Sequence, residues 1–185
     1  MATQTVRVDL LPNEIEQLAF LSRGRGQYSW WADDIDDINK NETSGAIRAG
    51  SVVLALGSDA IRVSCLAIDL LFGDEAFRLC IERIPAPQRL AGPPVDASPS
   101  SSVKYADEIE HGTKTWLIYR EHEYDGEGVL NRSGMTVIVP DALLINGPER
   151  QVLVQVNSFP TWLSVTRDPE SISRVVDSAV EIRMV

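Results

Sequence analysis

The run KTWLIYREHEY, residues 114–124, decides the fold because its pattern is that of one long strand. Successive side chains of a strand point to opposite faces of its sheet. One face of this run therefore carries Trp116, Ile118, Arg120 and His122. A Pro- and Ser-rich stretch precedes it, and Asp and Gly residues that favour a turn follow it. The pattern predicts a strand but specifies no reaction.

Similar alternation predicts further strands on both sides of this run. The expected strands are residues 5–10, 51–56, 60–66, 76–84, 135–139, 151–158, 161–166 and the last residues of the chain. Pro140 is expected to end the strand at 135–139, because proline cannot donate a hydrogen bond to a neighbouring strand. The short turns between several of these runs favour antiparallel hairpins.

Two helices are predicted from apolar residues at helical spacing. The first covers residues 13–22 and follows Pro12, a residue suited to the first helical position. The second begins after Asp168, which can cap it. Residues 105–110 are interpreted as a helical turn. Strands outnumber helices, so the sequence predicts an α+β fold: a mainly antiparallel sheet with two or three helices packed on one face or end.

The chain length predicts a single domain over residues 1–185. A flexible loop is expected at about residues 85–103, because the sequence there is rich in Pro and Ser and poor in large apolar residues. The alternative is a linker between two halves. It is less favoured because each half is short for independent stability.

The charge balance bears on partners. The chain has 17 basic and 27 acidic residues, a formal net charge of −10 and a pI near 4.6. An acidic surface repels polyphosphate and attracts basic proteins, so we expect a basic protein partner and no nucleic acid. The sequence starts without a signal-peptide pattern and has no long uncharged apolar run. We therefore expect a cytoplasmic location and no membrane contact.

Residues 25–44 form the most unusual stretch, because aromatic and acidic residues lie close together. The candidate partner-binding residues are Tyr28, Trp30, Trp31, Asp33, Asp34, Asp36 and Asp37. One interpretation is structural: a short surface helix that Ile35 and Ile38 anchor, pinned by its tryptophans and with its aspartates turned to solvent. The other is functional: a contact patch with an aromatic centre and an acidic rim. We call these seven residues the acidic–aromatic patch.

The favoured functional hypothesis is a non-catalytic acidic binding protein. Its most concrete version is an immunity- or antitoxin-type inhibitor that covers a basic toxin, such as a nuclease. The sequence contains no Gly-x-Ser-x-Gly, phosphate-loop or dinucleotide-binding motif, and we assign no catalytic residue and no cofactor. A third class, a subunit of a larger assembly, would use Trp30 and Trp31 as an oligomer contact.

A small metal-dependent enzyme is the alternative from another class. Two histidines lie near carboxylates, and imidazole and carboxylate groups are ligands for divalent metals. The candidate ligands are His111, His122, Glu121 and Glu123. The competing interpretation is that these residues form ordinary surface ion pairs of small energy.

Overall fold

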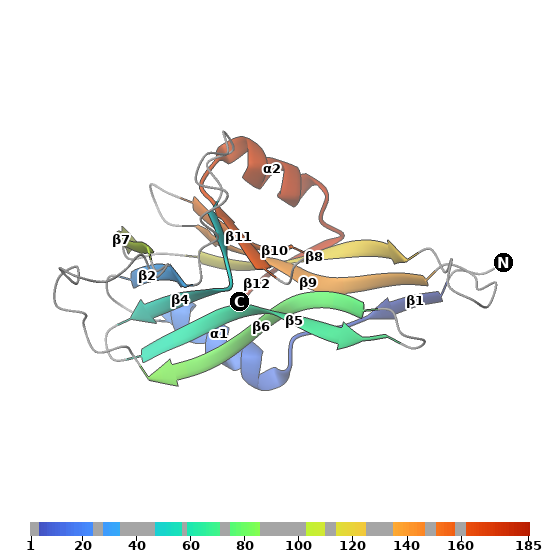
Figure 1. Cartoon of the computed structure of the whole chain (residues 1–185), viewed down its shortest axis with the longest axis horizontal. Coiled ribbons are helices and arrows are strands. Elements are labelled where there is room, and N and C mark those ends of the chain that lie inside the picture. Colours follow the sequence, from blue (N-terminus) through green and yellow to red (C-terminus); the bar gives the residue numbers. More distant parts are fainter. Residues whose placement is uncertain are drawn as a thin grey trace.

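Two sheets and two helices make up the described part of the computed structural model (Figure 1). The structure describes residues 4–23, 28–33, 47–56, 59–70, 75–85, 103–109, 114–124, 135–146, 151–157 and 162–185. Most of the predicted loop at 85–103 lies outside these ranges, as do Asp34, Asp36, Asp37 and His111. No helix in the described ranges has the length and apolar character needed to cross a membrane.

The larger sheet has seven strands in the order β12-β8-β9-β10-β11-β3, with β1 paired to β9 as well. Its strands are β1 (Gln4–Arg7), β3 (Ile47–Ala49), β8 (Lys114–Tyr124), β9 (Met135–Asn146), β10 (Gln151–Asn157), β11 (Trp162–Thr166) and β12 (Glu181–Met184). All pairs of neighbouring strands in this sheet are antiparallel except β1 and β9, which run parallel. The predicted strand at 114–124 is confirmed at both ends.

The smaller sheet has five antiparallel strands in the order β6-β5-β4-β2-β7. Its strands are β2 (Tyr28–Asp33), β4 (Ser51–Leu56), β5 (Asp59–Asp69), β6 (Glu75–Pro85) and β7 (Val103–Ile109). The sequence-based predictions for β4, β5 and β6 are confirmed, with β5 and β6 longer than expected.

One helical prediction is wrong: the helical turn expected at 105–110 is instead strand β7 up to residue 109. Residues 28–33 form β2, whereas Ile35 and Ile38, the anchors of the expected surface helix, lie outside the described residues. The reason is long-range pairing: β2 lies between β4 and β7, with Trp30 opposite Leu54 and Tyr105. Neither stretch alternates clearly, so its local pattern does not reveal that it is a strand.

Both predicted helices are present, as α1 (Pro12–Arg23) and α2 (Pro169–Asp177). The Asp168 side chain caps α2 by accepting the Ser171 backbone N–H at 2.9 Å. The antiparallel character is confirmed, but the class is mainly β and not α+β. The reason is that the helices are few and short, whereas the strands of both sheets form most of the core.

The main core contains buried side chains from both sheets. Buried side chains from β4, β5, β6, β8, β9, β10 and β11 form one apolar cluster with Leu10 and Leu18. A second, smaller cluster packs α2 on the larger sheet, and its buried members are Ile118, Ala142, Leu144, Leu153, Ile172 and Val175. Helix α2 therefore covers only part of one sheet face.

Strand β9 contains a β-bulge at Asp141. Tyr119 of β8 lies opposite Pro140, and Ile118 lies opposite Ala142, so Asp141 is the extra residue. The prediction that the strand ends at Pro140 is wrong, because β9 continues to Asn146. Proline is tolerated at a bulge, where a regular ladder hydrogen bond is not required.

Two strands pair with the same edge of β9, one before the bulge and one after it. Residues 135–138 of that edge pair with β1, whereas residues 142–146 pair with β10. Asp141 therefore lies between the two paired segments. This break in the sheet is where the candidate site is found.

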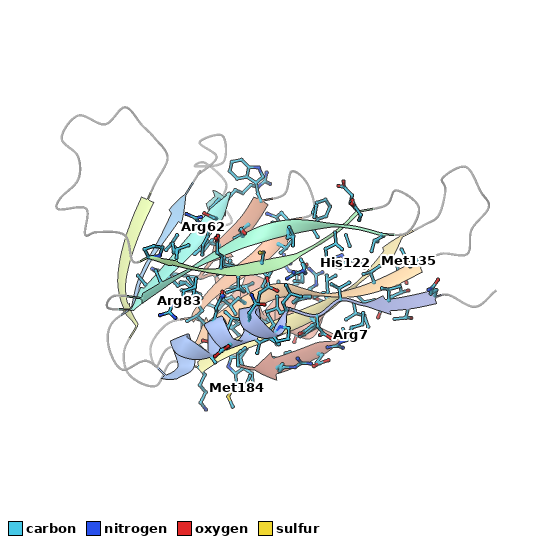
Figure 2. The ribbon with its side chains drawn as sticks, turned by 90° about the horizontal axis from the view of Figure 1, so that it is seen from below. Arg7, Arg62, Arg83, His122, Met135 and Met184 are labelled. Atoms are coloured by element: carbon cyan, nitrogen blue, oxygen red, sulfur yellow. The ribbon has the colours of Figure 1, made fainter. Side chains whose placement is uncertain are left out.

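Helix α1 lies beside β6, the edge strand of the smaller sheet (Figures 1 and 2). The Glu14 carboxylate accepts hydrogen bonds from Arg78 Nη1 at 2.8 and 3.0 Å and from the Ile81 backbone N–H at 3.1 Å. It also accepts the Leu11 N–H at 2.7 Å, which satisfies a free donor at the start of α1. One buried carboxylate thus joins the helix to the sheet edge.

Candidate functional site

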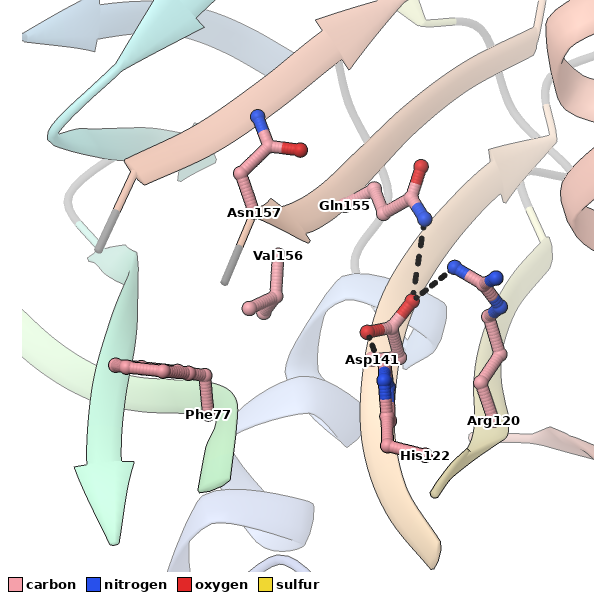
Figure 3. Close-up of a pocket in the computed structure, with 7 residues that line it drawn as sticks. All are labelled: Phe77, Arg120, His122, Asp141, Gln155, Val156 and Asn157. Carbon is pink, nitrogen blue, oxygen red and sulfur yellow. Dashed lines mark hydrogen bonds and ion pairs between the residues drawn. The ribbon is translucent and has the colours of Figure 1, made fainter. Parts of the chain in front are cut away.

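A pocket of about 190 Å³ opens beside the bulge in β9 (Figure 3). It is lined by side chains from β6, β8, β9 and β10, namely Phe77, Arg120, His122, Asp141, Gln155, Val156 and Asn157. Polar groups meet on one side of the pocket, and Phe77 lies across from them (Figure 3). The pocket therefore combines an apolar wall with a set of hydrogen-bonding groups.

Asp141 is the centre of the polar side. It is only 1% exposed, and three side chains converge on its carboxylate. Its Oδ1 lies 3.2 Å from His122 Nε2, while Oδ2 accepts from Arg120 Nη1 and Gln155 Nε2, each at 3.2 Å. Burial of a carboxylate is costly unless it is paired, so these partners offset the cost of burying Asp141. In return, Asp141 fixes the orientation of all three.

Local sequence explains how these side chains meet. Arg120 and His122 are two apart on β8 and so share a face, as the sequence predicted. Gln155 is on β10 and lies opposite Ala142 of β9, the residue that follows the bulge. The bulge turns Asp141 toward all three, because the extra residue breaks the regular alternation of β9.

The accessible charge in the pocket is positive. The Arg120 and His122 side chains are 29% and 32% exposed, whereas the side chain of Asp141 is 2% exposed. Arg120 directs Nη1 at Asp141, and a guanidinium has further N–H groups at Nε and Nη2. A molecule that enters the pocket therefore meets the cation and the ring before it meets the buried anion.

Among the described residues that line the pocket, none has a hydroxyl or thiol group that would serve as a nucleophile. Cys65 of β5 is close enough to Asp141 to be influenced by its charge. Burial, and secondarily the Asp141 carboxylate, raise the pKa of the Cys65 thiol to about 11. Burial also raises the pKa of Cys80. Both cysteines therefore remain protonated thiols near neutral pH, which is unfavourable for nucleophilic attack.

The predicted metal ligands are only partly visible. His122 lines the pocket, whereas Glu121 and Glu123 are exposed neighbours that alternate to the other face of β8. Asp141, not one of these glutamates, is the carboxylate beside His122. Within the described ranges no three His, Cys, Asp or Glu side chains gather closely enough to hold a metal ion. Because His111 lies outside those ranges, the metal hypothesis stays a prediction.

The acidic–aromatic patch is also divided. Its first four residues belong to β2, a strand with neighbours on both edges, and its last three lie outside the described residues. The use of this patch as a contact surface stays a prediction.

Sequence reasoning missed Asp141, Gln155 and Phe77. A signal for Asp141 was present, since it is the one charged residue within the apolar run MTVIVPDALLIN of β9. Because Pro140 was expected to end the strand, Asp141 was not assigned to the sheet, and its position beside β8 and β10 was not predicted. Gln155 and Phe77 carry no comparable signal, because their positions depend on which strands become neighbours.

Comparison with known proteins adds no relative: no family model, curated protein or solved structure matches the chain. Functional inference therefore depends on the pocket itself and on the charge of the chain.

Proposed function

We propose that this protein is a non-catalytic binding protein whose pocket beside Asp141 holds a small carboxylic acid. The observation that supports this most is the contrast in exposure between the covered Asp141 carboxylate and the accessible Arg120 guanidinium. A guanidinium recognises a carboxylate through paired N–H groups in a fixed geometry. Asp141 is covered, so it opposes an incoming anion less than an exposed carboxylate would. Because its charge also offsets that of Arg120, recognition depends on hydrogen bonds from the outer N–H groups of the guanidinium.

The size of the pocket limits the ligand. Its volume of about 190 Å³ is below the range of roughly 300–1,000 Å³ found for drug-sized ligands. It is slightly above the roughly 150 Å³ of an apolar cavity that holds one benzene ring. A single ring with one carboxylate therefore fits. Phe77 and Val156 would contact the ring, and Arg120 and Asn157 would contact the carboxylate.

Benzoate is expected to raise the unfolding temperature of the protein in a concentration-dependent manner, and benzamide is expected to raise it less. A ligand that binds only the folded state stabilises it by about 2.7 kcal/mol at roughly 100 times its Kd. Benzamide has nearly the same shape but no charge for Arg120 to recognise. Thermal shift measurements at fixed pH and ionic strength, followed by calorimetric titration, test this.

Arg120→Gln is the informative variant, and Arg62→Gln is its matched control. Arg62 is a partly exposed arginine on β5 that pairs with Glu82 at 3.6 Å, and it is not among the pocket-lining residues. We expect the benzoate effect to disappear in Arg120→Gln and to persist in Arg62→Gln. Equal responses of the two variants would place carboxylate binding elsewhere and reject the pocket.

A second candidate function is supported by the net charge of −10. Here the protein covers a basic protein partner, and an inhibitor of a cationic toxin remains its most concrete form. An acidic surface speeds association with a basic partner, and salt weakens that effect. The acidic–aromatic patch would supply the contact, with the aromatic residues as anchors and the aspartates as a rim.

Charge reversal tests this second candidate. We expect a variant with four aspartates replaced by lysine to associate much more slowly with a basic partner, because attraction at the contact becomes repulsion. The replaced residues are Asp33, Asp34, Asp36 and Asp37. The control has the same net change at four exposed carboxylates elsewhere, Glu16, Asp69, Glu75 and Glu170. Association rates would be measured with partners retrieved from the source cell. If both variants slow association equally, only overall charge matters and the patch is not the contact.

A further inference from the structure

Strand β12 forms one edge of the larger sheet. It pairs with β8, and no strand within the described ranges lies beyond it. In Figure 2, β12 and the labelled Met184 lie at the margin of the molecule. An uncovered edge presents unpaired backbone N–H and C=O groups, which readily pair with another strand.

Apolar side chains gather on this edge. Five large apolar residues in the described part of the chain are exposed, and three of them are in or next to β12. They are Val180, Ile182 and Met184, exposed by 47%, 41% and 59%. Ile182 and Met184 are two residues apart in β12 and so share one face of the strand, and Val180 lies just before the strand begins. A row of exposed apolar residues beside free backbone groups is typical of an interaction surface.

The backbone of β12 also indicates which groups face outward. The Val185 N–H donates to the Thr115 carbonyl of β8 at 3.0 Å. In an antiparallel pair, hydrogen bonds to a given neighbour come from alternate residues. The N–H groups of Glu181 and Arg183 therefore point to β8 like that of Val185. Those of Ile182 and Met184 point to the free edge, whereas the N–H of Val180, just before the strand, donates to the Tyr119 carbonyl of β8 at 3.0 Å.

We propose that a second copy of this chain docks on this edge, with β12 pairing antiparallel to β12 of the other copy about a two-fold axis at Ile182. The sequence VEIRM, residues 180–184, is complementary to itself in that register. Ile182 meets Ile182, Val180 meets Met184, and Glu181 meets Arg183. Closed two-fold dimers are the commonest oligomers, and their contacts must be self-complementary in this way.

Charge selects this register over its neighbours. A shift by two residues would still pair Ile182 with an apolar residue, but it would place Glu181 opposite Glu181 or Arg183 opposite Arg183, and like charges directly opposite each other are destabilising. Glu181 and Arg183 are already held in place, because Glu181 binds Arg183 at 3.0 Å and Arg7 at 2.8 Å in the same chain. Because the paired strands are only four residues long, the dimer is expected to be weak and concentration-dependent.

Two measurements on the full chain test the dimer. Sedimentation velocity from micromolar to millimolar concentration is expected to show a monomer–dimer equilibrium. Amide hydrogen exchange by NMR gives the site-specific result. Protection of the Ile182 and Met184 amides is expected to rise with concentration, while the Arg183 amide, bonded to β8 in both states, is expected to remain unchanged. A monomer at every concentration overturns the proposal.

Ile182→Lys is the main variant, because a lysine at the two-fold axis meets its own copy there. Its matched control is Leu66→Lys, which introduces the same charge at an equally exposed residue of β5. We expect Ile182→Lys to be monomeric and Leu66→Lys to dimerise like the wild type. If both behave like the wild type, the contact lies elsewhere. If both abolish dimerisation, net charge and not β12 controls it, and the proposal again fails.

Arg183→Glu tests the register independently. It brings a second carboxylate opposite Glu181 of the other copy, so dimerisation is expected to weaken by at least tenfold. The exchanged double variant Glu181→Arg with Arg183→Glu restores opposite charges across the axis and is expected to recover much of the loss. Circular dichroism verifies that each variant is folded. A double variant as weak as the single one, in folded protein, would exclude this register.

Discussion

Replacing Glu14 by leucine is expected to lower the free energy of unfolding by about 3–5 kcal/mol, the usual cost of removing one partner of a buried ion pair. Glu14 and Arg78 are both buried, and the Glu14 carboxylate accepts hydrogen bonds from both a side chain and the backbone of β6. Without it, the Arg78 guanidinium and the Ile81 N–H have no acceptor at that position. Urea unfolding followed by circular dichroism measures the loss.

The double variant Glu14→Leu with Arg78→Met distinguishes the net contribution of the ion pair from the cost of leaving one buried charge without its partner. Both charges are then absent, so the cost is expected to be smaller than that of either single replacement, because a buried pair can be replaced by apolar residues nearly neutrally. The exposed pair Arg62–Glu82 is the control, and Glu82→Leu is expected to cost less than about 1 kcal/mol. The interpretation fails if Arg78→Met alone costs as little as Glu82→Leu.

Tyr119→Ala is the second replacement for which we expect a large effect, about 3–5 kcal/mol of unfolding free energy. Tyr119 is the largest fully buried side chain of the described core. The guanidinium groups of Arg7 and Arg183 lie over its ring, at 4.6 and 5.3 Å from the centroid. Truncation would leave a cavity and would also remove these cation–π contacts, which join β1 and β12 to β8.

Tyr119→Phe keeps the ring and removes the hydroxyl, so it distinguishes the contributions of the two groups to stability. The hydroxyl is buried and forms no hydrogen bond within the described residues, so we expect nearly unchanged stability at pH 7. Burial, and then the nearby Asp9 carboxylate, raise the pKa of Tyr119 to about 12 from its usual 10. The folded state thus holds the phenol proton more tightly than the unfolded state does. The stability that this difference provides is complete below pH 10 and is lost as the pH rises toward 12.

The phenylalanine variant should therefore lose less stability than the wild type between pH 10 and 12. Cys65 has a raised pKa of about 11 and would add its own loss from pH 9, so both proteins should carry Cys65→Ala. Unfolding temperatures at about pH 8 and at successive alkaline values provide the comparison. Parallel curves for the two proteins would show that Tyr119 ionisation does not contribute.

The sequence by itself determined those elements whose burial follows a short period. The alternation in KTWLIYREHEY predicted β8 with its correct ends, and the same rule found β4, β5, β6, β10 and β11. Helices α1 and α2 followed from apolar residues at helical spacing beside a suitable first residue. Such patterns are readable because a strand or helix with one buried face repeats its apolar residues every two or about 3.6 positions.

Only the tertiary structure decided where residues far apart in sequence meet. β2 and β7 are strands because each finds partners along its edge, which no local period shows. Asp141 meets Arg120, His122 and Gln155 because a bulge in one strand coincides with the parting of β1 and β10 along its edge. Glu14 meets Arg78 because α1 lies along an open sheet edge. Strand pairing and burial set these contacts, and both depend on the whole chain at once.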